Sequence, residues 1–178
     1  MRYYIKGIVD LINSFARKEF VLPENSKYTW HEKDVLVMLD SISKHYPING
    51  IVFNKDKEGN TTVVLGINAM TAILKCFAHP KDKLKIAAYN TFYDLYKKEF
   101  LFAENPSETQ IPTQSLFDAW DCFQWERKME NHIDFDILLN EYQRISNVID
   151  EFRTCVFTLY DTTDKEIQTI KERNNLFI

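Results

Sequence analysis

The spacing of apolar side chains divides the chain into helical and extended stretches. The strongest helical pattern spans residues 134–153, where an apolar stripe runs from Ile137 to Phe152. The last helix begins at a capping box that runs from Thr163 to Glu166. Periodicity and capping residues together predict helices over residues 3–18, 31–45, 68–78, 113–128, 134–153 and 164–173.

Shorter apolar and β-branched runs between the helices predict strands. Residues 51–53 and 61–65 flank a charged segment that contains Gly59, which indicates a β-hairpin with a longer loop. Gly66 then marks a tight turn into the next helix. Further strands are expected at 20–22 and 155–160 and, within the ambiguous stretch 83–104, at 84–88 and twice between 92 and 102. Because strands neither alternate regularly with helices nor group as a sandwich, the fold class is α+β.

The length of the chain favours one folding unit. A chain of 178 residues can bury roughly 70% of its unfolded surface without a metal or disulfide. The one candidate boundary is the loop at 103–111, which we interpret as internal to a single domain spanning residues 1–178. No apolar run approaches the roughly 18 residues that a membrane span requires, so no membrane partner is expected.

Charge narrows the possible partners. The formal net charge is −4, but residues 1–90 hold 13 Lys and Arg against 9 Asp and Glu, whereas residues 91–178 hold 9 against 17. A mildly acidic chain lacks the many phosphate-contacting cations of a non-specific nucleic-acid binder. The basic half still leaves room for a local anionic ligand, although asymmetry of this size is also common in ordinary proteins.

Cysteine and histidine spacing gives no metal motif. The three cysteines are far apart and form no C-x-x-C pair, which is typical of a reducing compartment such as the cytoplasm. The four histidines are equally scattered, so no local metal site is expected. Asp118, Asp121 and Glu126 lie on one predicted helix, with Glu130 beyond it. They could form paired carboxylates, but we interpret them as a solvated acidic face.

A longer pattern covers residues 20–77 and returns near the other end of the chain. There, a strand, an acidic capped turn and a helix end in a motif that contains Arg173 and Asn175. The earlier part runs from an apolar stretch through a polar loop, an amphipathic helix and the hairpin, and is marked by Pro23, Trp30, Ser41-Ile42, Tyr46-Pro47-Ile48 and Gly66. This layout resembles the N-terminal domain of GmrSD-type modification-dependent restriction proteins. The resemblance implies a ParB/sulfiredoxin-like fold, with a small mixed sheet, a β-hairpin and several packing helices.

The residues of that family's functional motifs are replaced in this chain. Family members carry Asp-Gly-Gln-Gln-Arg at the turn after the hairpin, and they are linked to nucleotide-dependent action on DNA. In this chain Leu65 stands in the Asp place and Ala69 in the Arg place. Leu cannot bind a metal or a proton, and Ala cannot clamp a phosphate. In the first family motif, Gln-Arg becomes Ser26-Lys27.

The resemblance therefore implies a vestigial ligand pocket without catalytic residues or a metal. Its expected members are Lys27, Gly66, Asn68, Arg173 and Asn175. No cofactor is expected, and a nucleotide or Mg²⁺ is expected only if the site is active. Two simpler interpretations stay open: Gly66 serves only the turn, and Asn68 caps the helix.

Three functions compete. The leading one is a degenerate ParB-like module that binds a partner in bacterial defence against foreign DNA, without the helical and H-N-H-type nuclease domains of larger relatives. The alternative is a nucleotide-dependent DNA-processing enzyme with a rearranged site, in which Asp40, Asp94 or Asp161 replaces the lost carboxylate. The third is an interaction protein or homo-oligomer that uses Trp120, Phe123 and Trp125, although core packing also explains these aromatic residues.

Overall fold

A computed structural model of the chain describes residues 2–24, 27–48, 50–79, 84 and 86–175, except the side chains of residues 174 and 175. Within this part, the helices are α1 (Ile8–Ala16), α2 (Glu32–Ser43), α3 (Ile67–Phe77), α4 (Ala119–Met129), α5 (Phe135–Glu151) and α6 (Asp164–Asn175). The strands are β1 (Arg2–Gly7), β2 (Ile51–Lys55), β3 (Thr61–Leu65), β4 (Thr91–Asp94), β5 (Glu99–Phe102), β6 (Gln110–Pro112) and β7 (Arg153–Tyr160). The predicted α+β class is confirmed.

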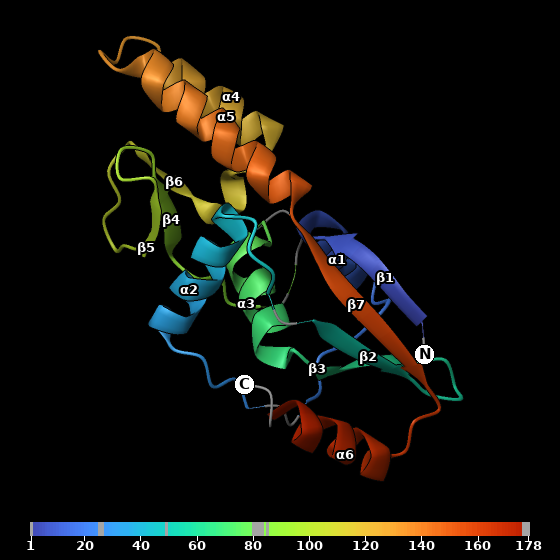
Figure 1. Ribbon diagram of the computed structural model, residues 1–178. Coiled ribbons are helices and arrows are strands. Elements are labelled where there is room, and N and C mark those ends of the chain that lie inside the picture. The colour runs from blue at the N-terminus through green and yellow to red at the C-terminus, as the bar shows by residue number, and fades with distance from the viewer. Residues whose placement is uncertain (1, 25–26, 49, 80–83, 85, 176–178) are drawn as a thin grey trace.

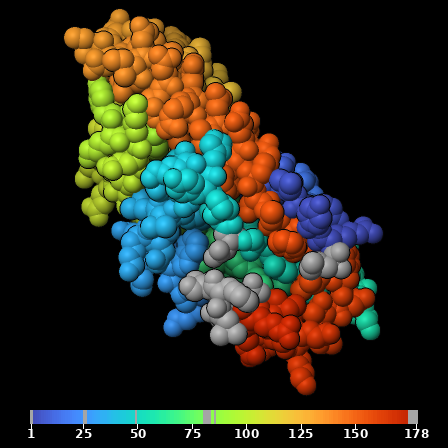
Figure 2. All heavy atoms as spheres, in the orientation of Figure 1, coloured from blue at the N-terminus to red at the C-terminus, as the bar shows by residue number. Residues whose placement is uncertain are grey.

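The larger sheet has four strands in the order β1-β7-β2-β3. Strands β2 and β7 run parallel, whereas β1 pairs antiparallel with β7 and β3 pairs antiparallel with β2. The sheet is thus mixed, and β2 and β3 form the predicted hairpin. Figure 1 shows α6 beyond one end of this sheet, whereas the paired helices α4 and α5 project at the opposite end of the molecule. The space-filling view in Figure 2 shows α5 and α6 at these two ends.

The smaller sheet has the order β5-β4-β6, and a buried polar network ties it to α5. The Tyr93 hydroxyl donates to Glu141 Oε1 over 2.7 Å, and the Arg144 guanidinium donates to both carboxylate oxygens. Tyr93 and Glu141 are both buried, whereas the Arg144 side chain is 45% exposed. Lys98 Nζ lies 3.5 Å from Glu141 Oε2. Tertiary hydrogen bonds therefore complement apolar packing between β4 and α5.

One hydrophobic cluster joins both sheets and the helices between them. It includes Ile51 and Phe53 of the larger sheet, Tyr93 of the smaller sheet, and Tyr142 of α5. Trp30 is partly buried and packs against this cluster, so it anchors the loop that precedes it. None of the described helices is long and apolar enough to cross a membrane.

The N-terminal segment differs from its prediction as one helix over residues 3–18. Residues 2–7 form β1, and α1 begins only at Ile8. Ile5 lies at helical spacing from Ile8, but its backbone pairs with Cys155 in β7. The strand partner lies near the opposite end of the sequence, so local periodicity cannot reveal it. Tertiary pairing overrides the local pattern here.

Three other predicted elements differ in the structure. At the predicted strand 20–22, the described pairing is an isolated bridge between Val21 and Thr62. Leu84 and residues 86–88 are irregular rather than extended, and residue 85 lies outside the described residues. The predicted helix 113–128 is divided into a 3-10 turn at Thr113–Ser115 and helix α4, because the Asp118 side chain caps α4 by accepting from two backbone N–H groups.

Candidate functional site

The turn at Gly66 is closely packed. Gly66 adopts a left-handed conformation, with φ of 71°, and precedes α3 as its N-cap. A Cβ atom at this position would lie 2.9 Å from the Gly50 carbonyl oxygen and 3.3 Å from the Ile51 Cα atom. Ala69 is buried one turn into the helix. The turn therefore requires glycine for its own packing, whether or not a ligand approaches it.

Asn68 holds a loop instead of capping its helix. Its Oδ1 accepts from the Thr29 backbone N–H over 3.2 Å, and its Nδ2 donates to the Thr29 hydroxyl over 2.8 Å. Because Gly66 occupies the N-cap position, the interpretation of Asn68 as the cap is wrong. These bonds bring the loop that contains Lys27 to the Gly66 turn. Lys27 itself is exposed.

The two remaining predicted pocket residues belong to α6. Arg173 is exposed in the last turn of that helix. The hydrogen bonds and ion pairs found between described residues include none that joins Arg173 to Lys27, Gly66 or Asn68. Asn175 is within α6, but its side chain lies outside the described residues. Among the described residues, the structure thus joins the loop of Lys27 to Asn68 through Thr29, and the hydrogen bonds and ion pairs found include none between Arg173 and the Gly66 turn.

The three carboxylates considered for a rearranged site occupy separate surroundings. Asp40 pairs with Lys44 on the exposed face of α2, and Asp161 lies in a left-handed turn after β7. Asp94 is buried and accepts from the Gln110 side chain and two backbone N–H groups. Burial alone would raise the pKa of Asp94, but these hydrogen bonds outweigh it and hold the pKa below its usual range. Asp94 therefore stabilises a turn of the smaller sheet.

The thiols of Cys76 and Cys122 are poor nucleophiles. Burial raises the pKa of Cys76 to about 12. Burial and a hydrogen bond to Glu126 raise the pKa of Cys122 to about 11. Because the thiolate is the reactive form, both side chains are held in their unreactive state near neutral pH.

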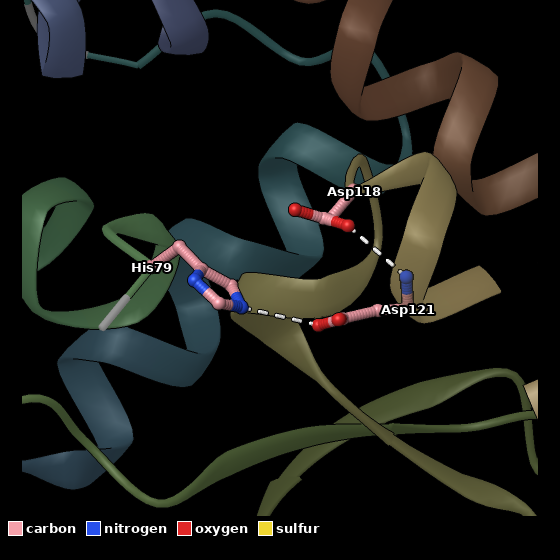
Figure 3. Close-up of side chains that lie close together, drawn as sticks. All are labelled: His79, Asp118 and Asp121. Atoms are coloured by element: carbon pink, nitrogen blue, oxygen red, sulfur yellow. Dashed lines mark hydrogen bonds and ion pairs between the residues drawn. The ribbon is translucent and has the colours of Figure 1, made fainter. Parts of the chain in front are cut away.

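A cluster of three polar side chains joins the end of α3 to the start of α4. His79 Nε2 lies 3.2 Å from Asp121 Oδ2, and one ligand atom of each of His79, Asp118 and Asp121 lies within 4.8 Å of the others. Figure 3 shows these three side chains pointing toward one another. We call them the His-Asp cluster. Its residues are partly buried, and the exposed fractions of the His79 and Asp121 side chains are 16% and 25%.

Neighbouring groups hold the two carboxylates of this cluster in place. Asp118 Oδ1 accepts from the backbone N–H groups of Trp120 and Asp121, each over 3.0 Å. The Ser115 hydroxyl donates to Asp121 Oδ2 over 2.6 Å. The interpretation of Asp118 and Asp121 as a solvated acidic face is therefore wrong, because both are partly buried and bonded at a helix start. Sequence spacing gave no signal that His79 would meet them.

The outer face of α4 exposes an aromatic pair beside a cation. The side chains of Trp120 and Phe123 are 61% and 45% exposed, and their ring centroids lie 5.8 Å apart. Arg127 lies over the Phe123 ring at 5.9 Å from its centroid. Trp125 instead stacks on Tyr142 at 5.1 Å, against the core. We refer to Trp120, Phe123 and Arg127 as the α4 face.

No protein-family model matches the chain, and no curated protein matches it.

Proposed function

We propose that this chain is a binding module that recognises a protein partner through the α4 face and performs no phosphoryl transfer or hydrolysis at the Gly66 turn. The resemblance to the GmrSD N-terminal domain suggests a ParB-like module in defence against foreign DNA. The retained hairpin, glycine turn and helix support that relationship. Leu65 and Ala69, in place of the family's Asp and Arg, support the loss of chemistry.

The observation that carries the proposal is the composition of the α4 face. Trp120, Phe123 and Arg127 follow one another at positions i, i+3 and i+7, so they share one side of the helix. Trp and Arg are among the residues most enriched at the positions that dominate binding energy in protein interfaces. Trp125 shows that the same helix has separate aromatic residues for the core. The exposed pair is therefore additional to what packing of α4 uses.

The chemistry of the face indicates the kind of partner. The aromatic pair offers apolar area, and the basic residues Arg127 and Lys128 lie in the last turn of the helix. Such a face complements an apolar patch with acidic residues at the rim that meets Arg127. A second copy of the chain is the competing occupant. Analytical ultracentrifugation over a range of concentrations should show a monomer, and a dimer weakened by Phe123→Ala would instead identify the second copy.

A photo-crosslinking experiment tests the proposed partner surface. A crosslinking residue at Gln124 on α4 should capture a partner in cells, whereas one at exposed Gln143 on α5 should not. The captured protein is then purified and its affinity measured. Trp120→Ala and Phe123→Ala should each weaken binding at least about tenfold, which corresponds to about 1.4 kcal/mol.

The matched control is Tyr46→Ala, which removes an aromatic side chain that is 59% exposed at another site. It should leave the affinity unchanged. Equal affinity for the unmodified chain and for both α4 variants would refute the α4 face as the binding surface, as would equal crosslinking from Gln143.

A turnover assay tests the absence of chemistry. The purified chain, incubated with nucleoside triphosphates, Mg²⁺ and DNA, should show neither nucleotide hydrolysis nor DNA cleavage above the buffer rate. The physical reason is the loss of a carboxylate and an Arg that would act on a phosphate, since one such electrostatic contact contributes about 2.7–4 kcal/mol to a transition state. Hydrolysis that Lys27→Ala and Arg173→Ala both abolish would contradict the proposal.

A further inference from the structure

We propose that His79, Asp118 and Asp121 together bind one divalent transition-metal ion, with Zn²⁺ as the best-matched metal. This inference is independent of the proposed partner surface, because the α4 face consists of other residues. The chain offers one imidazole nitrogen and two carboxylate groups at this place. That donor set is typical of Zn²⁺ and its neighbours in the first transition row. Mg²⁺ and Ca²⁺ prefer oxygen ligands alone, so the histidine disfavours them.

The distances in the cluster suit a small ion. Zn²⁺ bonds of about 2.0–2.2 Å in a tetrahedral arrangement place neighbouring ligand atoms about 3.4 Å apart. His79 Nε2 and Asp121 Oδ2 are already 3.2 Å apart. The widest separation among the three ligand atoms is within 4.8 Å, so a modest side-chain rotation completes the set. With three protein ligands, water would supply the fourth position.

The surrounding hydrogen bonds orient both carboxylates toward the shared space. A carboxylate has two oxygens, so Asp118 can cap α4 through Oδ1 while its other oxygen binds a metal. Ser115 donates to Asp121 and fixes the direction of its carboxylate. Bonds of this kind reduce the reorganisation needed on metal binding, and they commonly influence affinity by about 10- to 100-fold. The arrangement therefore has both ligands and orienting groups.

The place of the cluster in the fold suggests what the ion does. His79 follows the end of α3, whereas Asp118 and Asp121 begin α4, so a bound ion joins two helices across the segment that contains the smaller sheet. Because the three ligands meet only in the folded chain, the free energy of ion binding adds to the stability of the folded state. The ion would thus stabilise the position of α4. The competing explanation is an ion pair between His79 and Asp121 without any metal.

Metal titration of the full chain separates these explanations. After treatment with a chelator and dialysis, calorimetry should show one Zn²⁺ bound per chain, and a large excess of Mg²⁺ should not displace it. Co²⁺ should give weak visible bands without the strong near-ultraviolet absorption of a cobalt–thiolate bond. Asp121→Asn and His79→Gln should each weaken Zn²⁺ binding more than tenfold, while circular dichroism checks that both variants fold.

Two matched variants control for other ligands. Glu130→Gln changes an exposed acid beyond the end of α4, and His45→Gln changes an exposed histidine elsewhere, so neither should alter the affinity. A folded wild-type chain that binds no Zn²⁺ would overturn the proposal. So would Zn²⁺ binding that both cluster variants leave unchanged, or a Co²⁺ spectrum dominated by thiolate absorption. The last measurement uses the unmodified chain and stays decisive if the variants fail to fold.

Discussion

Gly66→Ala is expected to lower the free energy of unfolding by about 2–4 kcal/mol. Two costs add at this position. The φ of 71° disfavours any side chain by about 1 kcal/mol. The new Cβ atom would also lie 2.9 Å from the Gly50 carbonyl oxygen, which belongs to the backbone and cannot rotate away. Urea unfolding followed by circular dichroism measures the change.

Gly59→Ala is the matched control because it separates the two costs. Gly59 also has a positive φ, of 91°, but a Cβ atom added there would have the flexible Lys55 Cε as its nearest neighbour, at 3.9 Å. This variant should therefore lose only the conformational part, about 1 kcal/mol. If both variants lose equal stability, close packing against Gly50 contributes nothing and the Gly66 turn is less constrained than its geometry indicates.

Gly66 has two possible roles at this turn, which are close packing and the approach of a ligand. In the resembling family, the glycine turn is associated with phosphate, and Gly66 alone could suggest the same here. The contacts with Gly50 and Ile51 give the residue a sufficient structural reason. Packing alone therefore accounts for glycine at this position. Support for a ligand at this turn would have to come from Lys27 or Arg173.

Local patterns predicted the elements whose partners are close in sequence. The β2–β3 hairpin, the turn at Gly66 and the long helix α5 each follow from neighbouring residues, and each forms as expected. Strand β1 does not, because its partner β7 lies at the far end of the chain. The hydrophobic spacing of Ile5 with Ile8 gave a helical signal that the long-range pairing overrides.

In the candidate sites, too, contacts between residues that are far apart in the sequence could not be predicted from local patterns. The approach of His79 to Asp121 and the bonds between Thr29 and Asn68 both join residues on different elements. Residue type alone indicates neither contact. The spacing of His79 and Asp121 matches no metal motif, and Thr29 and Asn68 are far apart in the sequence. In the sequence, Trp120 and Trp125 belong to one aromatic group. The orientation of α4 in the fold decides that Trp120 is exposed whereas Trp125 packs on Tyr142.

Glu141→Gln is expected to lower the free energy of unfolding by about 2 kcal/mol at pH 6, because hydrogen bonds to charged groups contribute about 1.5–3 kcal/mol. The substitution keeps the shape of the side chain and an acceptor for Tyr93, but it removes the charge that pairs with Arg144. Because the Arg144 side chain is 45% exposed, water can solvate its guanidinium in the variant, and this limits the loss of stability. Tyr93→Phe is the matched control, with an expected loss of about 1 kcal/mol. Loss of less than about 0.5 kcal/mol in Glu141→Gln would contradict a stabilising role of the charge.

The same variant isolates how Glu141 links stability to pH. Burial would raise the pKa of Glu141, but hydrogen bonds from Arg144 and Tyr93, with the charges of Arg144 and Lys98, outweigh it and hold the pKa below its usual range. The unfolded chain, with an ordinary glutamate pKa of about 4.3, therefore binds this proton more readily than the folded chain. Its stabilising contribution is fully present above about pH 4.3 and is lost as the pH falls through the folded-state value. The stability gap between the unmodified chain and Glu141→Gln should thus narrow from pH 6 to about pH 3, and other carboxylates cancel because both proteins contain them. A gap that stays constant or widens on acidification would show that the neutral form of Glu141 is held as well as the charged one.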